Sequence, residues 1–332
     1  MKLDSIRYLR CPTCAGELEL ASQKAVESGR VRTGVLICPC GKNYPIEGFI
    51  PRFVSSNNYA KKFGYQWLKH AKTQFDSYTG KPLSQKRFYA TTQWPYRLDN
   101  KVMLEVGCGA GRFTEIVVKT GAMVLSFDYS VAVEANYASN GHHDNLLIVQ
   151  ADLYNMPFPK GVADYLFCLG VLQHTPDVEK AFKTLPAFIR GGGQIAVDIY
   201  LKIPGVIPWL LRTSSSWNIV RPITSRMDPE KLYQFCEKHI DRMWWLAKKI
   251  NNKPWGPFVL RRLLVPPYIG VYDLSDDLLK LWMKLDMFDT LGAAYIYTQT
   301  LATAKKWFNE CQFANIEVCC GYNGINGRAI KP

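Results

Sequence analysis

The sequence lacks any apolar run as long as the roughly 18 residues that a membrane-spanning helix requires. The segment MKLDSIRYLRCPTC at its start has no apolar core of the kind that directs export, so we expect a cytoplasmic protein. Internal repeats and low-complexity tracts are absent as well. Hydrophobic residues make up 48% of the 332 and charged residues 21%, which is typical of a globular protein with a large core. In such a chain, ten cysteines favour free thiols and a metal site over disulfides.

The net charge of +13 is unevenly distributed along the chain. Residues 1–100 carry +9 and residues 201–285 carry +7, whereas residues 101–200 between them carry −3. This pattern indicates an anionic partner, which could be nucleic acid, a membrane surface or a phosphorylated substrate. Solvated surface charge explains the pattern equally well, because net charge alone does not identify a partner.

Short apolar runs alternate with stretches of helical periodicity in the middle of the chain. The strand-like runs are VMLEV, VLSF, LLIVQ, DYLFCLG and QIAVDIY, and the helical stretches are RFTEIVVKT, VAVEANYA and VEKAFKTLPAFI. This alternation predicts an α/β fold whose sheet is doubly wound, mostly parallel and covered by helices on both faces. Near the end, LATAKKWFNECQF predicts a last helix, and NIEVCCGY and GRAIKP predict two closing strands.

These patterns divide the chain into five expected parts. A segment rich in Pro, Trp and Arg separates the core from its closing elements, and we expect it to form loops and short helices. The parts are a small β module (1–54), a helical linker (55–100), the α/β core (101–200), a mainly helical insertion (201–285) and the completion of the core (286–332).

A glycine-rich loop follows the first strand of the core, within the segment Val102–Phe113. Gly107, Gly109 and Gly111 allow a tight turn from strand to helix and the close approach of a ligand. A dinucleotide-binding loop would need a further glycine at the next position, where the sequence has Arg112. The loop therefore predicts a ligand site and counts against NAD or FAD.

An aspartate follows each of the next two strands. Asp128 comes after MVLSF, 17 residues beyond Gly111, and Asp152 comes after LLIVQ. At these positions Asp128 could accept hydrogen bonds from both ribose hydroxyls of a nucleoside, and Asp152 one from an adenine amino group. Because the carboxyl ends of parallel strands meet at one edge, the loop and the two aspartates together predict a nucleoside site. Capping of a helix or turn is the alternative role for either aspartate alone.

The segments LEVGCGAGRF, SFDYS, VQADLYNMPF, FCLGVLQHTPD and AFKTLPAFIRGGGQIAVDIY resemble class I methyltransferases that use S-adenosylmethionine (SAM), in particular the type 11 group. The resemblance covers residues 101–200 and implies a Rossmann-like, SAM-binding core. It places Glu105 and the glycines at the methionine end of SAM, and Asp128 at its ribose. It also places Leu169 and Gly170 beside the sulfonium.

An FG.QW element at residues 63–67 precedes this core. It resembles an element of relatives from surface-polysaccharide gene clusters, where it is expected to fold over the cofactor. Packing in the core is the alternative for Trp67. The residues that these resemblances assign to SAM are Gln66, Trp67, Glu105, Gly107, Cys108, Gly109, Gly111, Arg112, Asp128, Tyr129, Asp152, Leu153, Leu169 and Gly170.

Two close cysteine pairs lie in the first part of the chain. Cys11 and Cys14 form a C-x-x-C pair, and Cys38 and Cys40 form a C-x-C pair. Such pairs suit tetrahedral Zn²⁺, and four thiolates would make the site structural because no coordination position stays open. The surrounding sequence resembles the zinc-ribbon module that occurs alone as an activator of tRNA and rRNA methyltransferases. Four unrelated thiols are the alternative.

Candidate catalytic residues lie after the fourth and fifth strands and before the last helix. His174 has an ordinary pKa of about 6.5, which suits a general base, although it could instead hold its loop. Asp198 and Tyr200 close the fifth strand and could face a substrate. Asp286 and Asp289 resemble a D..D…Y stretch of the polysaccharide-cluster relatives and could supply substrate contacts or a carboxylate base. Capping of a loop is the alternative for these two aspartates.

The insertion mixes Trp, Leu and basic residues in PGVIPWLLRTSSSW, DRMWWLAKKI and PWGPFVLRRLLVPPY. It could be a lid over the substrate or an interfacial surface that meets a bilayer carrying a lipid-linked substrate, and plain helix packing is the alternative. The leading hypothesis is a methyltransferase that acts on an oxygen of a sugar, glycan or other small molecule. An RNA base methyltransferase with a zinc finger is the second hypothesis, and a non-catalytic scaffold is the third. The oligomeric state stays open.

Overall fold

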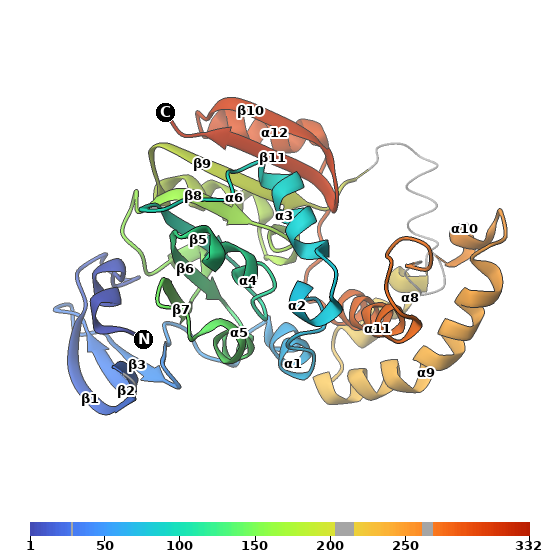
Figure 1. Cartoon of the computed structure of the whole chain (residues 1–332), viewed down its shortest axis with the longest axis horizontal. Helices are drawn as coiled ribbons and strands as arrows, with labels where there is room; N and C mark the ends of the chain where they lie inside the picture. The colour runs from blue at the N-terminus through green and yellow to red at the C-terminus, as the bar shows by residue number, and fades with distance from the viewer. Residues whose placement is uncertain (28, 203–215, 261–267) are drawn as a thin grey trace.

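A seven-stranded sheet forms the centre of the molecule in the computed structural model, which describes residues 1–27, 29–202, 216–260 and 268–332 (Figure 1). Its strands are β5 (Val102–Val106), β6 (Met123–Asp128), β7 (Leu146–Gln150), β8 (Ala163–Cys168), β9 (Ile189–Ile199), β10 (Ala314–Gly321) and β11 (Gly324–Ile330). Their order is β10–β11–β9–β8–β5–β6–β7. The strands from β5 to β9 are mutually parallel, whereas β11 is antiparallel to β9 and to β10. The predicted mostly parallel α/β sheet is confirmed.

The strands are apolar because both faces of the sheet are covered. Successive residues of β5 illustrate this, since Met103 packs in one apolar cluster and Leu104 in another on the opposite face. The covering helices are α3 (Leu83–Thr92), α4 (Thr114–Val117), α5 (Val133–Asn140), α6 (Val178–Thr184) and α12 (Leu301–Glu310). The stretch VEKAFKTLPAFI does not form one helix, because α6 gives way to a 3₁₀ turn that contains Pro186.

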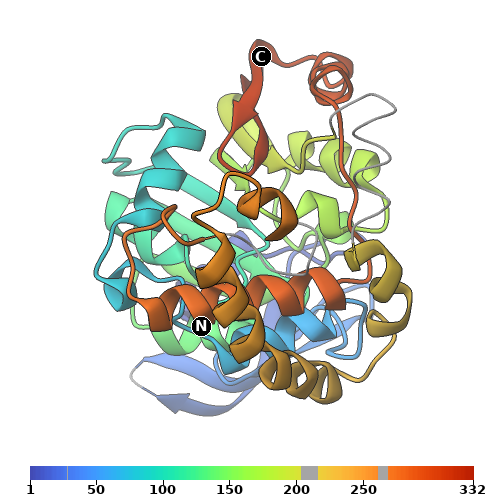
Figure 2. The same cartoon turned by 90° about the vertical axis from the view of Figure 1, so that its right-hand side faces the viewer.

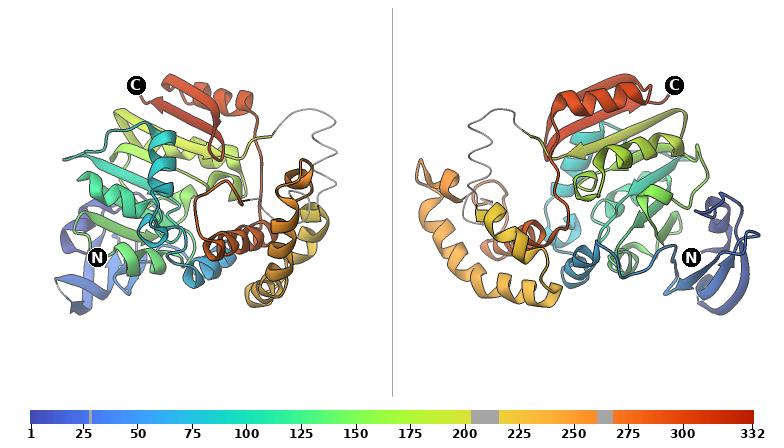
Figure 3. Two further views of the ribbon diagram at one scale, coloured as in Figure 1. Left: turned by 45° about the vertical axis from the view of Figure 1, so that its right-hand side comes forward. Right: turned by 180° about the vertical axis from the view of Figure 1, so that it is seen from behind.

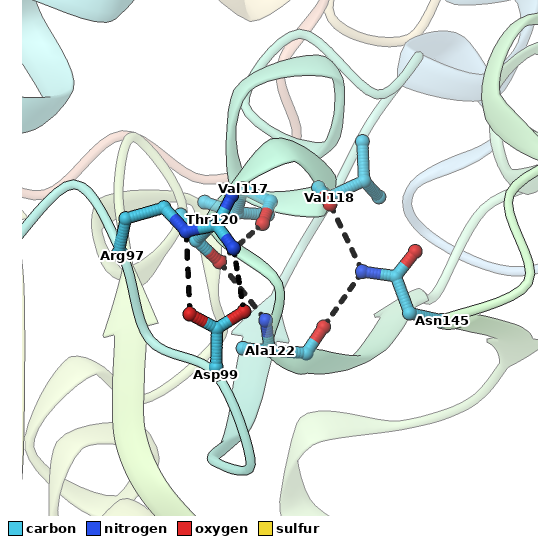
Figure 4. A network of polar contacts seen from close by, with 7 residues as sticks. All are labelled: Arg97, Asp99, Val117, Val118, Thr120, Ala122 and Asn145. Carbon is cyan, nitrogen blue, oxygen red and sulfur yellow. Dashed lines mark hydrogen bonds and ion pairs between the residues drawn. The ribbon is translucent and has the colours of Figure 1, made fainter.

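A polar network holds the amino-terminal edge of the sheet (Figure 4). The side-chain amide of Asn145, just before β7, donates to the carbonyls of Val118 and Ala122 at 2.9 and 2.8 Å. The hydroxyl of Thr120 accepts a hydrogen bond from the Ala122 N–H at 3.3 Å. These groups satisfy one another and fix the turn that leads into β6. This edge therefore has a structural role, and the opposite, carboxyl-terminal edge carries the candidate functional residues.

The first part of the chain folds into a separate antiparallel sheet, which we call the ribbon. Its strands are β1 (Glu19–Glu27), β2 (Arg30–Ile37), β3 (Asn43–Glu47) and β4 (Ile50–Pro51). The ribbon meets the core at β7, where Arg52 and Gln150 form a parallel bridge and the Phe53 N–H donates to the Gln150 carbonyl at 2.8 Å. Arg30 donates to the carbonyls of His142 and His143, beyond the end of α5, at 3.0 and 3.2 Å. The predicted small β module is thus confirmed.

The insertion contains longer helices than its sequence predicted. The linker forms α1 (Lys61–Lys69) and α2 (Asp76–Thr79), and the insertion forms α8 (Ser216–Thr224), α9 (Pro229–Ile250), α10 (Gly256–Leu260) and α11 (Asp276–Gly292). The expectation of short helices is wrong for α9 and α11, which have 22 and 17 residues. In addition, α11 runs across the expected boundary between residues 285 and 286. Residues 204–215 and 261–267, from two of the basic and aromatic stretches, lie outside the described residues.

Local signals explain why α9 forms. Asp228 accepts a hydrogen bond from the Glu230 N–H at 3.0 Å and caps the helix, and Pro229 occupies its first position. Its buried residues recur at helical spacing and pack against α11, and they are Leu232, Cys236, Ile240, Trp244 and Ala247.

The ribbon and the insertion lie at opposite ends of the molecule (Figure 3). Helices α9 and α11 run across the front of the view in Figure 2, with α1 behind them. Among the described helices, none combines the length and the apolar character that crossing a membrane would require.

Candidate active site

A cavity of about 420 Å³ opens at the carboxyl ends of the parallel strands, between the glycine loop, α1 and α11. Most of the residues that the sequence resemblance assigned to SAM line it, namely Gln66, Trp67, Gly107, Cys108, Gly109, Arg112, Asp128, Tyr129, Leu153, Leu169 and Gly170. The candidate catalytic residues His174, Asp286 and Asp289 line the same cavity. The structure therefore brings together residues from the core, the linker and the insertion.

The glycine loop has the backbone conformation that its sequence predicted. Gly107, Gly109 and Gly111 all have positive φ angles, of 76°, 52° and 93°. A Cβ atom at Gly111 would lie 2.2 Å from the side-chain oxygen of Asn136, so this position requires glycine on packing grounds as well. A Cβ atom at Gly109 would approach the indole nitrogen of Trp67 at 3.4 Å. The Trp67 indole therefore packs directly against the glycine loop.

Asp128 is held in place by the loop and by its own turn. Its Oδ2 accepts the Gly109 N–H at 2.9 Å, and its Oδ1 accepts the N–H and hydroxyl of Ser130 at 2.8 and 2.7 Å. Burial raises the pKa of this carboxyl above its ordinary value. Because a carboxylate offers about four acceptor sites, Oδ2 keeps capacity for a further donor from the cavity.

Glu105 and Gly111 do not line the cavity. Glu105 is buried behind the loop, where one oxygen accepts hydrogen bonds from the hydroxyls of Thr114 and Ser126 at 2.5 and 2.8 Å. Burial raises its pKa to about 7, and its second oxygen has no hydrogen-bond partner. In this geometry Glu105 supports the strand and helix on either side of the loop.

Asp152 has the capping role that was the alternative at the sequence level. Its two oxygens accept hydrogen bonds from the Tyr154 N–H at 3.0 Å and the Asn155 side chain at 3.3 Å. It is not among the lining residues, whereas its neighbours Ala151 and Leu153 are. The carboxylate keeps further acceptor capacity, but in this geometry its described partners belong to the turn.

Helix α1 covers the cavity and is tied to the insertion. The side-chain amide of Gln66 donates to the Leu285 carbonyl in α11 at 3.4 Å. Lys62 is buried and donates to the carbonyls of Thr224 and Ser225 at the end of α8, at 3.1 and 2.6 Å. The insertion and the FG.QW element of the linker therefore form one cover.

Two carboxyls from α11 face the cavity one helical turn apart. Burial and the neighbouring Asp289 raise the pKa of Asp286 to about 7, and burial raises that of Asp289 to about 7. One oxygen of Asp289 is buried without a hydrogen-bond partner. Burial and these two carboxyls also raise the pKa of the nearby Tyr200 hydroxyl. The expected loop-capping alternative is wrong for Asp286 and Asp289, because both lie within a helix.

His174 lines the cavity and also fixes the loop after β8. Its Nδ1 lies 3.0 Å from the Tyr295 carbonyl, which can only accept, so Nδ1 carries the proton. Its ring packs edge-on against Phe63 and Tyr200, at centroid distances of 5.0 and 5.6 Å. Burial lowers its pKa to about 4, so His174 is neutral at pH 7. These contacts favour the loop-holding alternative.

Asp198 forms a buried ion pair and does not line the cavity. One oxygen accepts from the Arg87 guanidinium at 2.6 Å, and the other accepts the Gly170 N–H. The direct contact with substrate that the sequence suggested for Asp198 does not fit this position. Asp198 instead holds Arg87 and the backbone of Gly170, and both of these do line the cavity.

The sequence did not reveal the aromatic and basic end of the cavity. Arg112 donates to Ser84 and Gln74, which are neutral, and its guanidinium lies 5.7 Å from the ring of Trp282. Burial lowers the pKa of Arg112 to about 10, with a further contribution from Arg87. Arg112 was assigned to SAM from the sequence, whereas the lining residues that sequence reasoning missed include Tyr59, Gln74, Arg87, Tyr268, Tyr272, Trp282, Thr290, Tyr322 and Asn323. Trp282, Asp286 and Asp289 have the i, i+4, i+7 spacing of one helix face. This spacing could have predicted from the sequence that the three side chains lie together.

The four cysteines of the ribbon form one cluster. Their sulfur atoms all lie within 4.8 Å of one another, with Cys11 and Cys40 at 3.7 Å and Cys14 and Cys38 at 3.4 Å. Tetrahedral zinc, with bonds of about 2.3 Å to sulfur, holds its sulfurs ~3.8 Å apart. The Tyr44 hydroxyl lies 3.1 Å from the Cys11 sulfur and can donate to a thiolate. The cluster therefore fits a structural zinc ion.

Comparison with known proteins supports this interpretation of the core. Residues 104–197 match the family model of a methyltransferase domain. The chain is 32% identical over 114 residues to a sterol 24-C-methyltransferase of Gibberella zeae, covering 33% of this chain and 28% of that protein. It is 31% identical over 101 residues to a ubiquinone biosynthesis O-methyltransferase of Coxiella burnetii, covering 30% and 43%.

A third relative carries a different activity in its name. The chain is 28% identical over 112 residues to a tRNA U34 carboxymethyltransferase of Campylobacter curvus, covering 32% of this chain and 38% of that protein. The chain thus spans less than half the length of the curated relatives it matches. The match supports a SAM-dependent methyltransferase domain of class I and leaves the acceptor open, since the three names refer to a sterol, ubiquinone biosynthesis and tRNA.

Proposed function

We propose that the protein transfers the methyl group of SAM to an oxygen of a small hydroxylated acceptor, such as a sugar or glycan. One observation carries this proposal: a nucleoside-type pocket and a pair of buried carboxyls, Asp286 and Asp289, face the same cavity. The pocket would bind and orient SAM, and a carboxylate would remove the proton of a weakly acidic hydroxyl.

The residues at the cofactor end fit SAM. The glycine loop and the Trp67 indole both line the cavity, and Asp128 keeps an acceptor site for a ribose hydroxyl. Within the described part of the chain, Arg112 has no acidic partner within 4 Å, so its charge suits a carboxylate such as that of the methionine moiety. When bound, SAM supplies a methyl carbon already activated by a sulfonium.

Asp289 is the best-placed general base in this arrangement. Its pKa of about 7 lies close to neutral pH, where a carboxylate base accepts a proton most effectively. Its Oδ1 is buried without a partner, so its other oxygen is the one that would meet an acceptor hydroxyl in the cavity. Asp286 interacts with the positive charges of Arg112 and Arg87, which both act to lower its pKa. We therefore assign Asp286 to binding and Asp289 to proton removal.

Calorimetric titration with SAM tests the cofactor half of the proposal. D128A should weaken SAM binding by about 10- to 100-fold, because it removes a charged hydrogen-bond acceptor. D152A is the matched control, since Asp152 caps a turn outside the cavity, and it should change SAM affinity far less. Absence of SAM binding by the wild-type protein would favour the scaffold hypothesis.

Transfer of a labelled methyl group tests the acceptor half. The protein should label sugars or glycans, and D289N should abolish the label while SAM binding persists. Transfer to RNA instead would support the RNA base hypothesis, to which the net charge of +13 is also suited.

A further inference from the structure

The outer face of α9 carries mainly basic and aromatic residues, with Gln234 and Asp241 at its border. Positions 231, 238, 242, 245 and 249 lie opposite the buried stripe that packs on α11, since successive helical residues are 100° apart. They are occupied by Lys231, Lys238, Arg242, Trp245 and Lys249, and all five side chains are exposed.

Two of the three acidic residues of α9 do not offset this charge, because they pair with lysines of α11, and the third, Glu230, lies in the first turn of the helix. Glu230 accepts a hydrogen bond from the Tyr65 hydroxyl, Glu237 pairs with Lys284, and Asp241 pairs with Lys280. The outer face therefore keeps a one-sided positive charge.

Aromatic side chains continue this surface beyond the end of α9. Trp245 is 57% exposed and carries the Lys249 ammonium 3.9 Å above its ring. Lys253 and Trp255 follow in the next turn, and Trp255 is 54% exposed. Large exposed tryptophans are unusual on a protein surface that only meets water. We call Lys238, Arg242, Trp245, Lys249, Lys253 and Trp255 the outer patch.

We propose that the outer patch binds the surface of a membrane that contains anionic lipids. Lysine and arginine attract lipid phosphates, while tryptophan rings favour the boundary between headgroups and acyl chains. Trp245 is exposed among lysines on an amphipathic helix whose opposite face is buried, which is typical of helices that lie at a bilayer surface. Helix α9 lies at the end of the molecule opposite to the ribbon (Figure 3).

This proposal does not depend on methyl transfer and can be tested without an acceptor. The full chain is sedimented with vesicles of phosphatidylcholine alone, or of phosphatidylcholine mixed with phosphatidylglycerol. We expect binding to the mixed vesicles only, and loss of binding at high salt. K249Q/K253Q should weaken the binding about tenfold or more, and W245S/W255S should weaken it with the charge unchanged.

The control is K119Q/K305Q, which removes two exposed lysines elsewhere on the surface and should leave vesicle binding unchanged. SAM affinity, measured on every variant, reports that the cavity is intact. Equal binding to both vesicle types, or none, would overturn the proposal. So would a patch variant that loses binding to structured RNA while wild-type vesicle binding is absent, since this outcome would assign the patch to nucleic acid.

Discussion

The ribbon and the insertion are both additions to one α/β core, yet they meet it in opposite ways. The described part of the ribbon contributes no side chain to the lining of the cavity. It packs on the core through apolar contacts, such as Phe49 stacked on Tyr137 of α5, and also through the bridge at the edge strand β7 and the ion pair of Arg52 with Glu134. The insertion contributes Tyr268, Tyr272, Trp282 and the two aspartates of α11 to the cavity wall. The difference indicates that the ribbon supports the site from outside, whereas the insertion forms part of it.

The support from the ribbon side reaches the cofactor end in two steps. Arg52 donates to the Gln150 side chain at 3.0 Å, and Gln150 donates to the Tyr129 carbonyl at 3.1 Å. Asn58, just after the ribbon, donates to the same carbonyl at 2.8 Å. Tyr129 follows Asp128 directly, so these bonds hold the backbone beside the proposed ribose contact.

Loss of zinc should give the largest effect and should separate the two additions. C38S removes one of four expected ligands, and structural zinc contributes about 10 kcal/mol or more of binding free energy in small domains. We expect C38S to lose zinc and to unfold the ribbon in a separate thermal transition. SAM affinity should fall less than in D128A, because the ribbon contacts the site only indirectly.

The measurements are zinc content, thermal unfolding and SAM titration of the purified variants. C320S is the matched control, since Cys320 is exposed and lies outside the cluster. A C38S protein that keeps its zinc and its unfolding temperature would contradict the assigned ligand set.

The next largest effect concerns the acidic pair of the insertion. Because the pKa of Asp289 is about 7 in the folded protein against an ordinary value of 3.8, the folded state binds the proton more tightly. Wild-type stability should therefore fall as the pH rises from about 4 to 7 and level off above 7. D289N avoids this loss and should be more stable than wild type at pH 8 by about 4 kcal/mol.

Denaturant unfolding at pH 5 and pH 8 measures this difference. D277N is the control, because Asp277 is an exposed residue of the first turn of the same helix. If D289N gains no stability at pH 8 relative to pH 5, Asp289 is ionised at little cost and cannot be the buried base that we propose.

The smallest effect tests how the ribbon is anchored. Arg30 donates to the carbonyls of Gly141, His142 and His143 and pairs with Asp144 at 3.0 Å. R30A should cost about 1–2 kcal/mol of stability. R32A should cost less than about 0.5 kcal/mol, since Arg32 forms an exposed pair within the ribbon. Equal effects in calorimetric unfolding would show that the anchor has no special role.

The core and its loop were predictable because their signals are local. The glycine spacing, the aspartate after MVLSF and the alternation of apolar runs each depend on a few neighbouring residues. They located the sheet edge and most of the cofactor end of the cavity. The cysteine spacing likewise anticipated a four-sulfur cluster, although the two pairs are separated along the chain.

The acceptor end could not be predicted in the same way. The pair of Arg87 with Asp198 joins residues 111 positions apart, so although Asp198 was a candidate from its place at the end of a strand, its partner could not be predicted. Asp286 and Asp289 were recognised as candidates but were expected in a loop, because the helical spacing that starts before Trp282 was overlooked. Asp152 occupies a position that the family resemblance assigns to adenine, but its side chain caps a local turn. A match to a family position therefore does not by itself fix the contacts of a side chain.

The parallel bridge between Arg52 and Gln150 has a consequence for behaviour in concentrated solution. β7 is the last strand of the central sheet, and such a strand offers unpaired amide and carbonyl groups to any passing extended chain. The ribbon occupies part of that border, with the Phe53 N–H bound to the Gln150 carbonyl. If the cysteine cluster holds zinc as we expect, removing the metal should uncover this border, and self-association should then accompany demetallation even where the cavity stayed whole.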